Sequence, residues 1–278
     1  MKRITAIATL LILLSTALQA QQIRIASYNL RFDNPRDSGN LWVNRQPVIS
    51  ALIRFHNFDI FGTQEGLRHQ LDTLGASLKA YTWYGLGRDD GKSAGEHSAI
   101  FWKKEKYTLL GKGDFWLSET PEKPGPGWDA KLNRICTWVQ LQDVKSKKKF
   151  FVFNVHFDHQ GVKAREESGS LILQKIKTIA GNAAVMLTGD FNGDQKSGWY
   201  LNIANSKTLR DTYRDVKEPY ENNASFNGFG RQSDANGIID HIFVTKHFTV
   251  QRWGVLTDTY HGKFPSDHFP VMADVTLK

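Results

Sequence analysis

The chain has 278 residues, of which 40% are hydrophobic and 23% are charged, and its formal net charge at neutral pH is +8. These proportions exclude a disordered or fibrous chain, and the length fits one large globular domain or two small ones. A single cysteine, Cys136, excludes an internal disulfide, and we interpret it as a small buried hydrophobic residue.

A secretory signal peptide is predicted over residues 1–20. Two basic residues precede an apolar run over residues 4–14, and the small Ala20 stands before the expected cleavage site. The run is too short to cross a bilayer, so we expect no membrane span and an exported mature chain over residues 21–278. Cleavage lowers the net charge from +8 to +6, because two basic residues are lost. This modest excess favours polyanionic partners without requiring them.

The first elements predicted in the mature chain are a strand, a helix and a second strand. Strand patterns cover residues 23–30 and 58–65, and a helical pattern lies between them. The apolar stripe predicted for this helix consists of Val48, Ala51, Leu52 and Phe55. Such a unit is typical of a parallel crossover. The strands end in Asn29 and Glu65, at the edge where open α/β sheets usually place their chemistry.

Further strands are predicted over four segments in the middle of the chain. The segments 97–102 and 107–117 are expected to pair through a lysine-rich turn, and 135–141 and 149–157 through another. Asn154 and His156 share one face of the last strand, where buried polar groups require partners. The pattern is equally consistent with His156 as a structural core histidine and as a site residue.

A helix is predicted over residues 164–180, followed by a short buried strand that stops at Gly189. Asp190 and Asn192 come next and, on an extended backbone, point the same way. They could hold a hydrated metal ion or orient a water molecule, or they could simply cap a turn. We expect Asp190 to lie near solvent at the end of this strand.

The last part of the chain combines a buried charge with a candidate partner. Asp240 interrupts the apolar stripe of a strand predicted over residues 237–244, so it must be paired. Asp267 and His268 precede the final strand, and His268 is the candidate partner of Asp240. The sequence shows neither an internal repeat nor a linker, so we expect a single domain.

Six short motifs together resemble, in order, those of the endonuclease/exonuclease/phosphatase superfamily. They are Ser27-Tyr28-Asn29, Thr63-Gln64-Glu65, Asn154-x-His156, Gly189-Asp190-Phe191-Asn192, Ile239-Asp240-His241 and Ser266-Asp267-His268. Each motif is weak, but six in this order at strand ends are specific. The resemblance covers the mature chain and implies a four-layer α/β/β/α sandwich, in which two mixed β-sheets pack face to face with helices outside.

The resemblance also implies a hydrolase of phosphoester bonds that uses Mg²⁺ or Mn²⁺. The metal ligands carried over from the motifs are Glu65, Asn29 and Asp267. The catalytic residues carried over are Asp190, Asn192, His156, Asp240 and His268. Asp190 would orient the attacking water or take its proton, His156 would donate to the phosphate or leaving group, and Asp240 would steady His268. Whether Asp190 or His268 is the base stays open.

Phosphate contacts are expected from Asn29, Arg31 and Asn154. Arg31 is equally consistent with an ion pair to Asp33. Arg134 and Arg165 lie by loops that border the expected site.

Export, positive charge and His156 slightly favour a phosphodiester substrate such as nucleic acid. The alternative is a small phosphorylated sugar, inositol or lipid headgroup, enclosed by the polar loops over residues 85–95 and 221–237. A non-catalytic binding module of the same fold is a remote alternative, because a module of that kind would be expected to have lost ligands. No protein partner is inferred, and we expect a monomer.

Overall fold

A computed structural model describes residues 22–231 and 237–278 of the chain. The predicted signal peptide and a short part of the long polar loop lie outside the described residues. Within the described residues, no helix has the length and apolar character needed to cross a membrane.

The first sheet contains six strands in the order β11-β12-β1-β2-β4-β3. Their bounds are Phe248–Val255 (β11), Val271–Leu277 (β12), Gln22–Asn29 (β1), Ile60–Gln64 (β2), Ile100–Lys103 (β4) and Tyr81–Tyr84 (β3). Strands β1 and β2 are parallel, as the predicted crossover requires, and β1 is antiparallel to β12 on its other side.

The second sheet also contains six strands, in the order β5-β6-β7-β8-β10-β9. Their bounds are Tyr107–Trp116 (β5), Ile135–Asp143 (β6), Lys149–His156 (β7), Ala184–Asp190 (β8), Asp240–Val244 (β10) and Arg210–Asp211 (β9). Here β7 and β8 form the parallel pair, and β10 runs antiparallel to β8.

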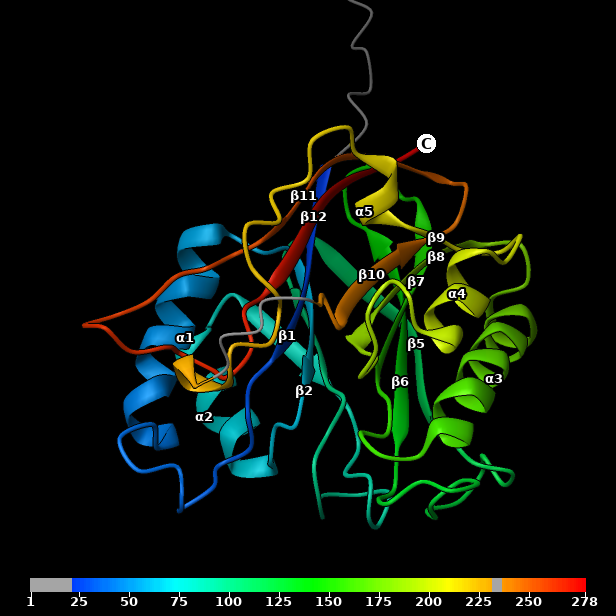
Figure 1. The fold of residues 1–278 in the computed structure, drawn as a ribbon. Helices are drawn as coiled ribbons and strands as arrows, with labels where there is room; N and C mark the ends of the chain where they lie inside the picture. Colours follow the sequence, from blue (N-terminus) through cyan, green and yellow to red (C-terminus); the bar gives the residue numbers. More distant parts are fainter. Residues whose placement is uncertain (1–21, 232–236) are drawn as a thin grey trace, which may run out of the picture.

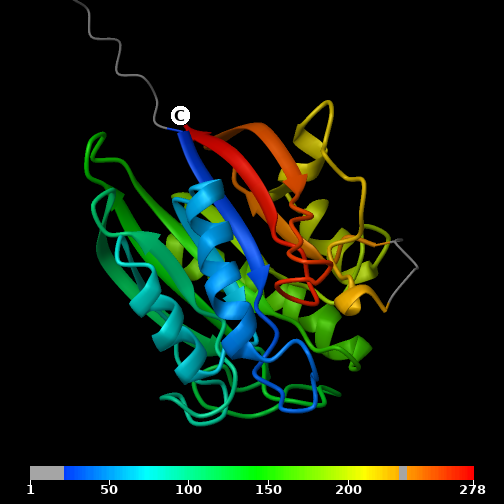
Figure 2. The same cartoon turned by 90° about the vertical axis from the view of Figure 1, so that its left-hand side faces the viewer.

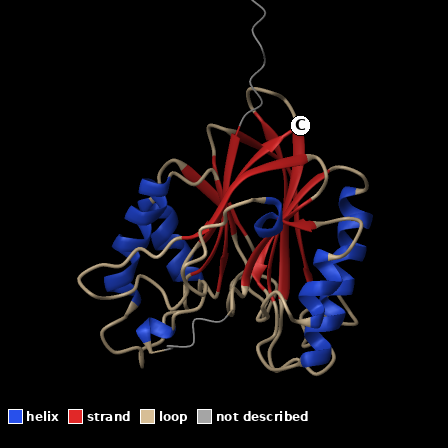
Figure 3. Ribbon diagram, turned by 45° about the horizontal axis from the view of Figure 1, so that its top comes forward, coloured by secondary structure: helices blue, strands red, loops and turns tan. Residues whose placement is uncertain are grey.

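Helices cover the outer face of each sheet, so the molecule has four layers (Figures 1 and 2). The helices are Trp42–His56 (α1), Arg68–Ser77 (α2), Val162–Ala180 (α3), Gly198–Ala204 (α4) and Thr212–Asp215 (α5). α1 and α2 lie against the first sheet, and α3 and α4 lie against the second, with both sheets between them (Figure 3). The two mixed sheets and their outer helices confirm the fold class expected from the sequence.

Three apolar clusters correspond to the three interfaces between these layers. The central cluster lies between the sheets and includes Ile25 of β1 and Val152 of β7. A second cluster joins the second sheet to α3, for example through Ile176. The third joins the first sheet to α1 and α2, for example through Ile53. Alternation along each central strand therefore sends apolar side chains to both faces, which sandwich packing requires.

Two expectations about local structure are wrong. The segments predicted to pair through the lysine-rich turn over residues 103–106 belong to different sheets, because β4 pairs with β2 and β3 whereas β5 pairs with β6. The helix α1 begins at Trp42 and turns Ile49 and Ile53 inward, so that Ala51 and Phe55 of the predicted stripe are exposed. The inner face also contains a buried arginine, Arg45, which a hydrophobic pattern does not reveal.

Asn154 does not reach the position expected for a phosphate contact. Its amide nitrogen donates to the carbonyls of Thr63 (2.8 Å) and Ala99 (3.1 Å), and its oxygen accepts from Gln64 (2.7 Å) and Thr188 (2.9 Å). The side chain is fully buried between the sheets, and all its hydrogen-bonding groups are occupied. It therefore joins the two sheets and leaves no polar group for a ligand.

Candidate active site

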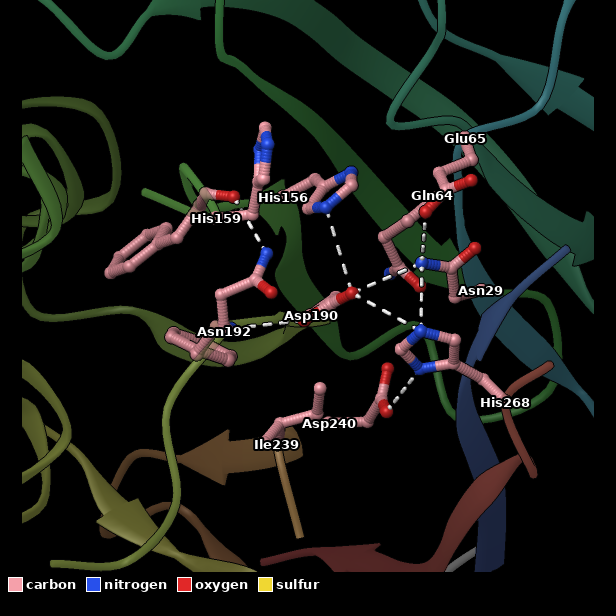
Figure 4. A network of polar contacts seen from close by, with 12 residues as sticks. Asn29, Gln64, Glu65, His156, His159, Asp190, Asn192, Ile239, Asp240 and His268 are labelled. Atoms are coloured by element: carbon pink, nitrogen blue, oxygen red, sulfur yellow. Dashed lines mark hydrogen bonds and ion pairs between the residues drawn. The ribbon is translucent and has the colours of Figure 1, made fainter. Parts of the chain in front are cut away.

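The functional side chains converge where the carboxyl ends of both parallel strand pairs meet. Asn29 ends β1, Glu65 follows β2, His156 ends β7, and Asp190 ends β8. Asp240 opens β10 directly opposite Asp190 across the antiparallel ladder. Figure 4 shows that these side chains, with His268 from the segment before β12, point toward one another.

The Asp190 carboxylate lies at the centre of this cluster. It is 1% exposed, so the expectation that it lies near solvent is wrong. Its Oδ2 accepts a hydrogen bond from Asn29 Nδ2 (3.0 Å) and lies 3.6 Å from His156 Nε2 and 3.7 Å from His268 Nε2. Burial, together with the charge of Asp240, raises the pKa of Asp190 to about 7. A carboxyl group with a pKa near neutrality suits proton transfer at neutral pH.

The predicted pairing of Asp240 with His268 is present in the structure. Asp240 Oδ2 lies 2.8 Å from His268 Nδ1, and both side chains are buried. Burial lowers the pKa of His268, but the charge of Asp240 and its hydrogen bond outweigh that effect and raise the pKa to about 10. This shift favours the imidazolium form of His268 at neutral pH, and an imidazolium can stabilise a phosphoryl oxygen.

The pKa of His156 is shifted in the opposite direction from that of His268. Its side chain is buried, and burial together with the positive charges of Arg134 and Arg88 holds the pKa of His156 well below its usual value. A neutral imidazole can donate one hydrogen bond, and Nε2 is the nitrogen that faces Asp190. His156 can therefore donate to a phosphate or leaving-group oxygen without bringing a charge into the site.

Glu65 and Asp267 place two carboxylates on the other side of the cluster. Burial raises the pKa of Asp267 to about 6 against the charge of His268, and the carboxylate of Glu65 adds to the rise. Asp267 is buried and Glu65 is half-buried, and carboxylate oxygens are the donors that a hard divalent cation prefers. These residues fit the predicted metal site, where a bound cation would supply the positive charge that a phosphoester needs.

Asn29 lies beside these carboxylates but presents its amide nitrogen to them. Nδ2 donates to Glu65 Oε1 (3.0 Å) as well as to Asp190, while Oδ1 accepts from the backbone N–H of Arg31 (2.9 Å). In this orientation Asn29 positions the carboxylates. Its predicted role as an oxygen ligand for a metal requires the amide to turn over.

A second group of residues could also hold a metal ion. Ligand atoms of Asp190, Asp240 and His268 lie within 4.8 Å of one another, and all three residues are buried. Because Asp240 already bonds to Nδ1 of His268, this group is also the candidate proton-transfer apparatus. The site thus contains two neighbouring groups of residues that could each hold a metal ion.

Asn192 and Arg31 complete the predicted set, and both line the pocket. The backbone N–H of Asn192 donates to Asp190 Oδ1 (2.9 Å). Arg31 does not pair with Asp33. Its guanidinium binds Asp37 (2.8 Å) and lies 3.7 Å from Asp267, where it can also contact a phosphate oxygen.

The cluster opens into a pocket of about 450 Å³, and the motifs did not reveal all of its lining residues. The pocket residues outside the six motifs are Arg31, Phe32, Arg88, Glu96, Leu132, Arg134, His159 and Phe226. Arg88 Nη1 donates to Glu96 Oε2 (2.5 Å), and Arg134 binds Asp158 (3.2 Å) and His159 (2.9 Å). Arg31 and Arg134 were expected at or beside the site, and Arg88 and Phe226 lie in the two polar loops expected to enclose a small substrate.

Comparisons with known proteins bear on the family and the fold of this chain. Residues 26–268 match the model of the Endonuclease/Exonuclease/phosphatase family. Among solved structures, an endonuclease/exonuclease/phosphatase family protein from Bacteroides thetaiotaomicron is 45% identical, with a TM-score of 0.91 and coverage of 94% of this chain and 99% of that one.

Two other solved structures resemble this chain to different degrees. A mannosyl-6-phosphatase from Bacteroides thetaiotaomicron is 45% identical, with a TM-score of 0.89 and coverage of 92% of this chain and 100% of that one. D. rerio TDP2, solved with a single-stranded DNA product, is only 16% identical, with a TM-score of 0.72 and coverage of 92% and 99%. The second likeness shows a shared fold and no more.

Proposed function

Because the chain belongs to the endonuclease/exonuclease/phosphatase family, we propose that it hydrolyses a phosphomonoester of a small sugar with the help of Mg²⁺ or Mn²⁺. The observation that carries the substrate class is the wall formed by Arg88 and Glu96, which lines the pocket beside His156, with Glu96 Oε2 3.9 Å from His156 Nδ1. A guanidinium that donates and a carboxylate that accepts are suited to sugar hydroxyl groups. The 45% identity to a mannosyl-6-phosphatase from Bacteroides thetaiotaomicron supports the same class.

The nucleic-acid substrate that the sequence slightly favoured is the second candidate, and the charge distribution supports it less. A nuclease that grips several phosphates needs free basic side chains along the path of the strand. Lys103 and Lys106 instead both bind Asp59 Oδ1, at 2.8 and 2.7 Å. On the pocket wall, Arg88 is already paired with Glu96 (2.5 Å), so its charge is not free to hold a second phosphate.

The raised pKa values of Asp190 and His268 support the following roles within this proposal. Asp190 takes the proton from the attacking water, because its pKa lies near neutrality while His268 is already charged. His268 stabilises the phosphoryl oxygens, and His156 donates to the leaving oxygen. We also propose that the mature protein acts outside the cytoplasm, on the basis of the predicted signal peptide over residues 1–20.

A substrate panel tests this proposal. Mannose 6-phosphate, bis-p-nitrophenyl phosphate and single-stranded DNA would be incubated with the protein and Mg²⁺ at low and high salt. We expect turnover of the sugar phosphate at least about 100-fold above DNA, little dependence on salt, and complete loss of activity in excess chelator. Faster cleavage of DNA that declines with salt would favour the nuclease, and full activity in chelator would exclude metal dependence.

The Arg88→Met variant tests the sugar-recognising wall. We expect kcat/KM to fall by roughly 30-fold or more for mannose 6-phosphate but by less than about threefold for p-nitrophenyl phosphate, which has no sugar hydroxyls. The second substrate therefore serves as the internal control. Equal losses for both substrates would show that Arg88 acts on the phosphate or on the fold and does not read the sugar.

A further inference from the structure

Arg45 of α1 is a fully buried arginine whose charge is met by backbone carbonyl oxygens. Nε donates to Asn40 O (2.7 Å), Nη1 to Leu30 O (2.7 Å) and Pro265 O (3.0 Å), and Nη2 to Arg31 O (3.0 Å). Among the residues that the structure describes, no carboxylate forms an ion pair with it. A buried guanidinium is costly, so an arrangement that uses four of its N–H groups on loop carbonyls calls for an explanation.

Two of these carbonyls belong to the peptide planes that hold Asn29 and Glu65. The plane that contains Leu30 O also contains the N–H of Arg31, which donates to Asn29 Oδ1 (2.9 Å). The next plane contains Arg31 O and the N–H of Phe32, which donates to Glu65 Oε2 (3.1 Å). Because a peptide unit is rigid, fixing its carbonyl oxygen also fixes its N–H.

The backbone conformation of Arg31 allows this arrangement but is energetically unfavourable. Its φ of 55° lies in the left-handed region, which a non-glycine residue rarely adopts. Both neighbouring carbonyls turn toward Arg45, and both N–H groups turn toward the site. The guanidinium therefore stabilises a backbone conformation that the residue itself disfavours.

The third contact reaches the segment that carries Asp267. Arg45 binds Pro265 O, and the hydroxyl of the following residue, Ser266, donates to Asn29 O (2.7 Å). The rings of Trp42 and Phe229 lie 5.4 and 5.6 Å from the guanidinium carbon and keep it apart from water. One side chain thus connects the backbone around all three predicted metal ligands.

We propose that Arg45 is a positioning residue that sets the geometry of the metal site formed by Glu65 and Asp267 and holds Asn29 beside these two carboxylates. This inference rests on the proposed metal dependence, and it concerns affinity for the ion. Loss of the guanidinium frees the peptide planes on which Asn29 and Glu65 depend. Outer contacts of this kind typically change metal affinity by 10- to 100-fold.

The test compares wild type with Arg45→Met and Arg45→Lys. Both variants lose the guanidinium fork, but the lysine variant keeps the positive charge. Mn²⁺ binding would be measured by electron paramagnetic resonance and by the rise in melting temperature that the ion produces. We expect both variants to bind Mn²⁺ at least about tenfold more weakly, while kcat at saturating Mn²⁺ stays within about threefold of wild type. The lysine variant decides the matter if the methionine variant does not fold.

Arg210→Met is the matched control. Arg210 also donates to backbone carbonyls, those of Thr245 and Phe248, but it joins β9 to the turn after β10, outside the pocket. We expect it to lower the melting temperature of the protein without changing Mn²⁺ affinity. Unchanged Mn²⁺ affinity in a folded Arg45 variant would overturn the inference. Absence of Mn²⁺ binding in wild type would overturn the metal proposal itself, and the inference with it.

Discussion

Asp190→Asn is expected to lower kcat on the order of 10³-fold without lowering the melting temperature. The loss follows from the removal of a general base, which typically contributes 10²- to 10⁴-fold. The amide keeps the shape of the carboxylate, and its single oxygen can still accept from the N–H of Asn192, while its NH2 group replaces the oxygen that accepts from Asn29 Nδ2. Burial of a neutral amide costs less than burial of a charge.

The pH dependence of stability fixes the direction in which the melting temperature of Asp190→Asn should differ from that of wild type. The pKa of Asp190 is raised to about 7 in the folded protein from an ordinary value of 3.8. Wild type therefore loses stability as pH rises from about 4 to 7, because the folded state binds the proton more tightly than the unfolded state. At pH 8, Asp190→Asn should melt at or above the temperature of wild type, and the difference should diminish toward pH 4.

Asp194→Asn provides the control for this experiment. Asp194 follows the same strand, but its carboxylate accepts from the N–H of Lys196 and the hydroxyl of Ser197, within a turn. Turnover should stay within about threefold of wild type. If Asp190→Asn retained turnover, or if it melted well below wild type at pH 8, Asp190 would be a structural residue.

The site could be predicted largely from the sequence because its residues end strands. A strand pattern fixes where an element stops, and parallel pairs bring such ends to one edge. This reasoning, combined with the family motifs, placed Asn29, Glu65, His156 and Asp190 in one cluster. It failed at Asn154, which shares a face with His156. Whether a buried amide binds a ligand or joins two sheets depends on the second sheet, which period-two alternation cannot reveal.

Features set by tertiary contacts could not be predicted. Arg88 and Glu96 lie in or beside a glycine-rich loop without periodicity, so their meeting on the pocket wall has no signature in the sequence. Arg45 was missed because the search for an inner helical face looks for apolar residues. The turn over residues 103–106 fits a hairpin locally, but pairing of β4 with β2 and β3 places the flanking strands in separate sheets.

Asp240→Asn is expected to lower both turnover and stability, with a stability loss that depends on pH. Removal of one partner from a buried ion pair typically costs about 3–5 kcal/mol. The pKa of His268 is raised to about 10 in the fold from 6.5, so its contribution to stability is fully present below pH 6.5 and is lost as pH rises through about 10. The difference between wild type and variant should therefore be largest near pH 6 and diminish toward pH 10.5.

Urea unfolding of wild type and Asp240→Asn at pH 6.5, 8.5 and 10.5 measures this trend. Turnover of the variant should fall roughly 100-fold because His268 loses its charge. Asp211→Asn is the matched control, because Asp211 is also a buried strand carboxylate but binds Tyr200 (2.6 Å) outside the pocket. Asp211→Asn should keep the turnover of wild type, and its difference in stability from wild type should not diminish toward alkaline pH. A stability difference for Asp240→Asn that stayed constant across the three pH values would show that His268 is uncharged, and a role in holding phosphoryl oxygens by charge would then be untenable.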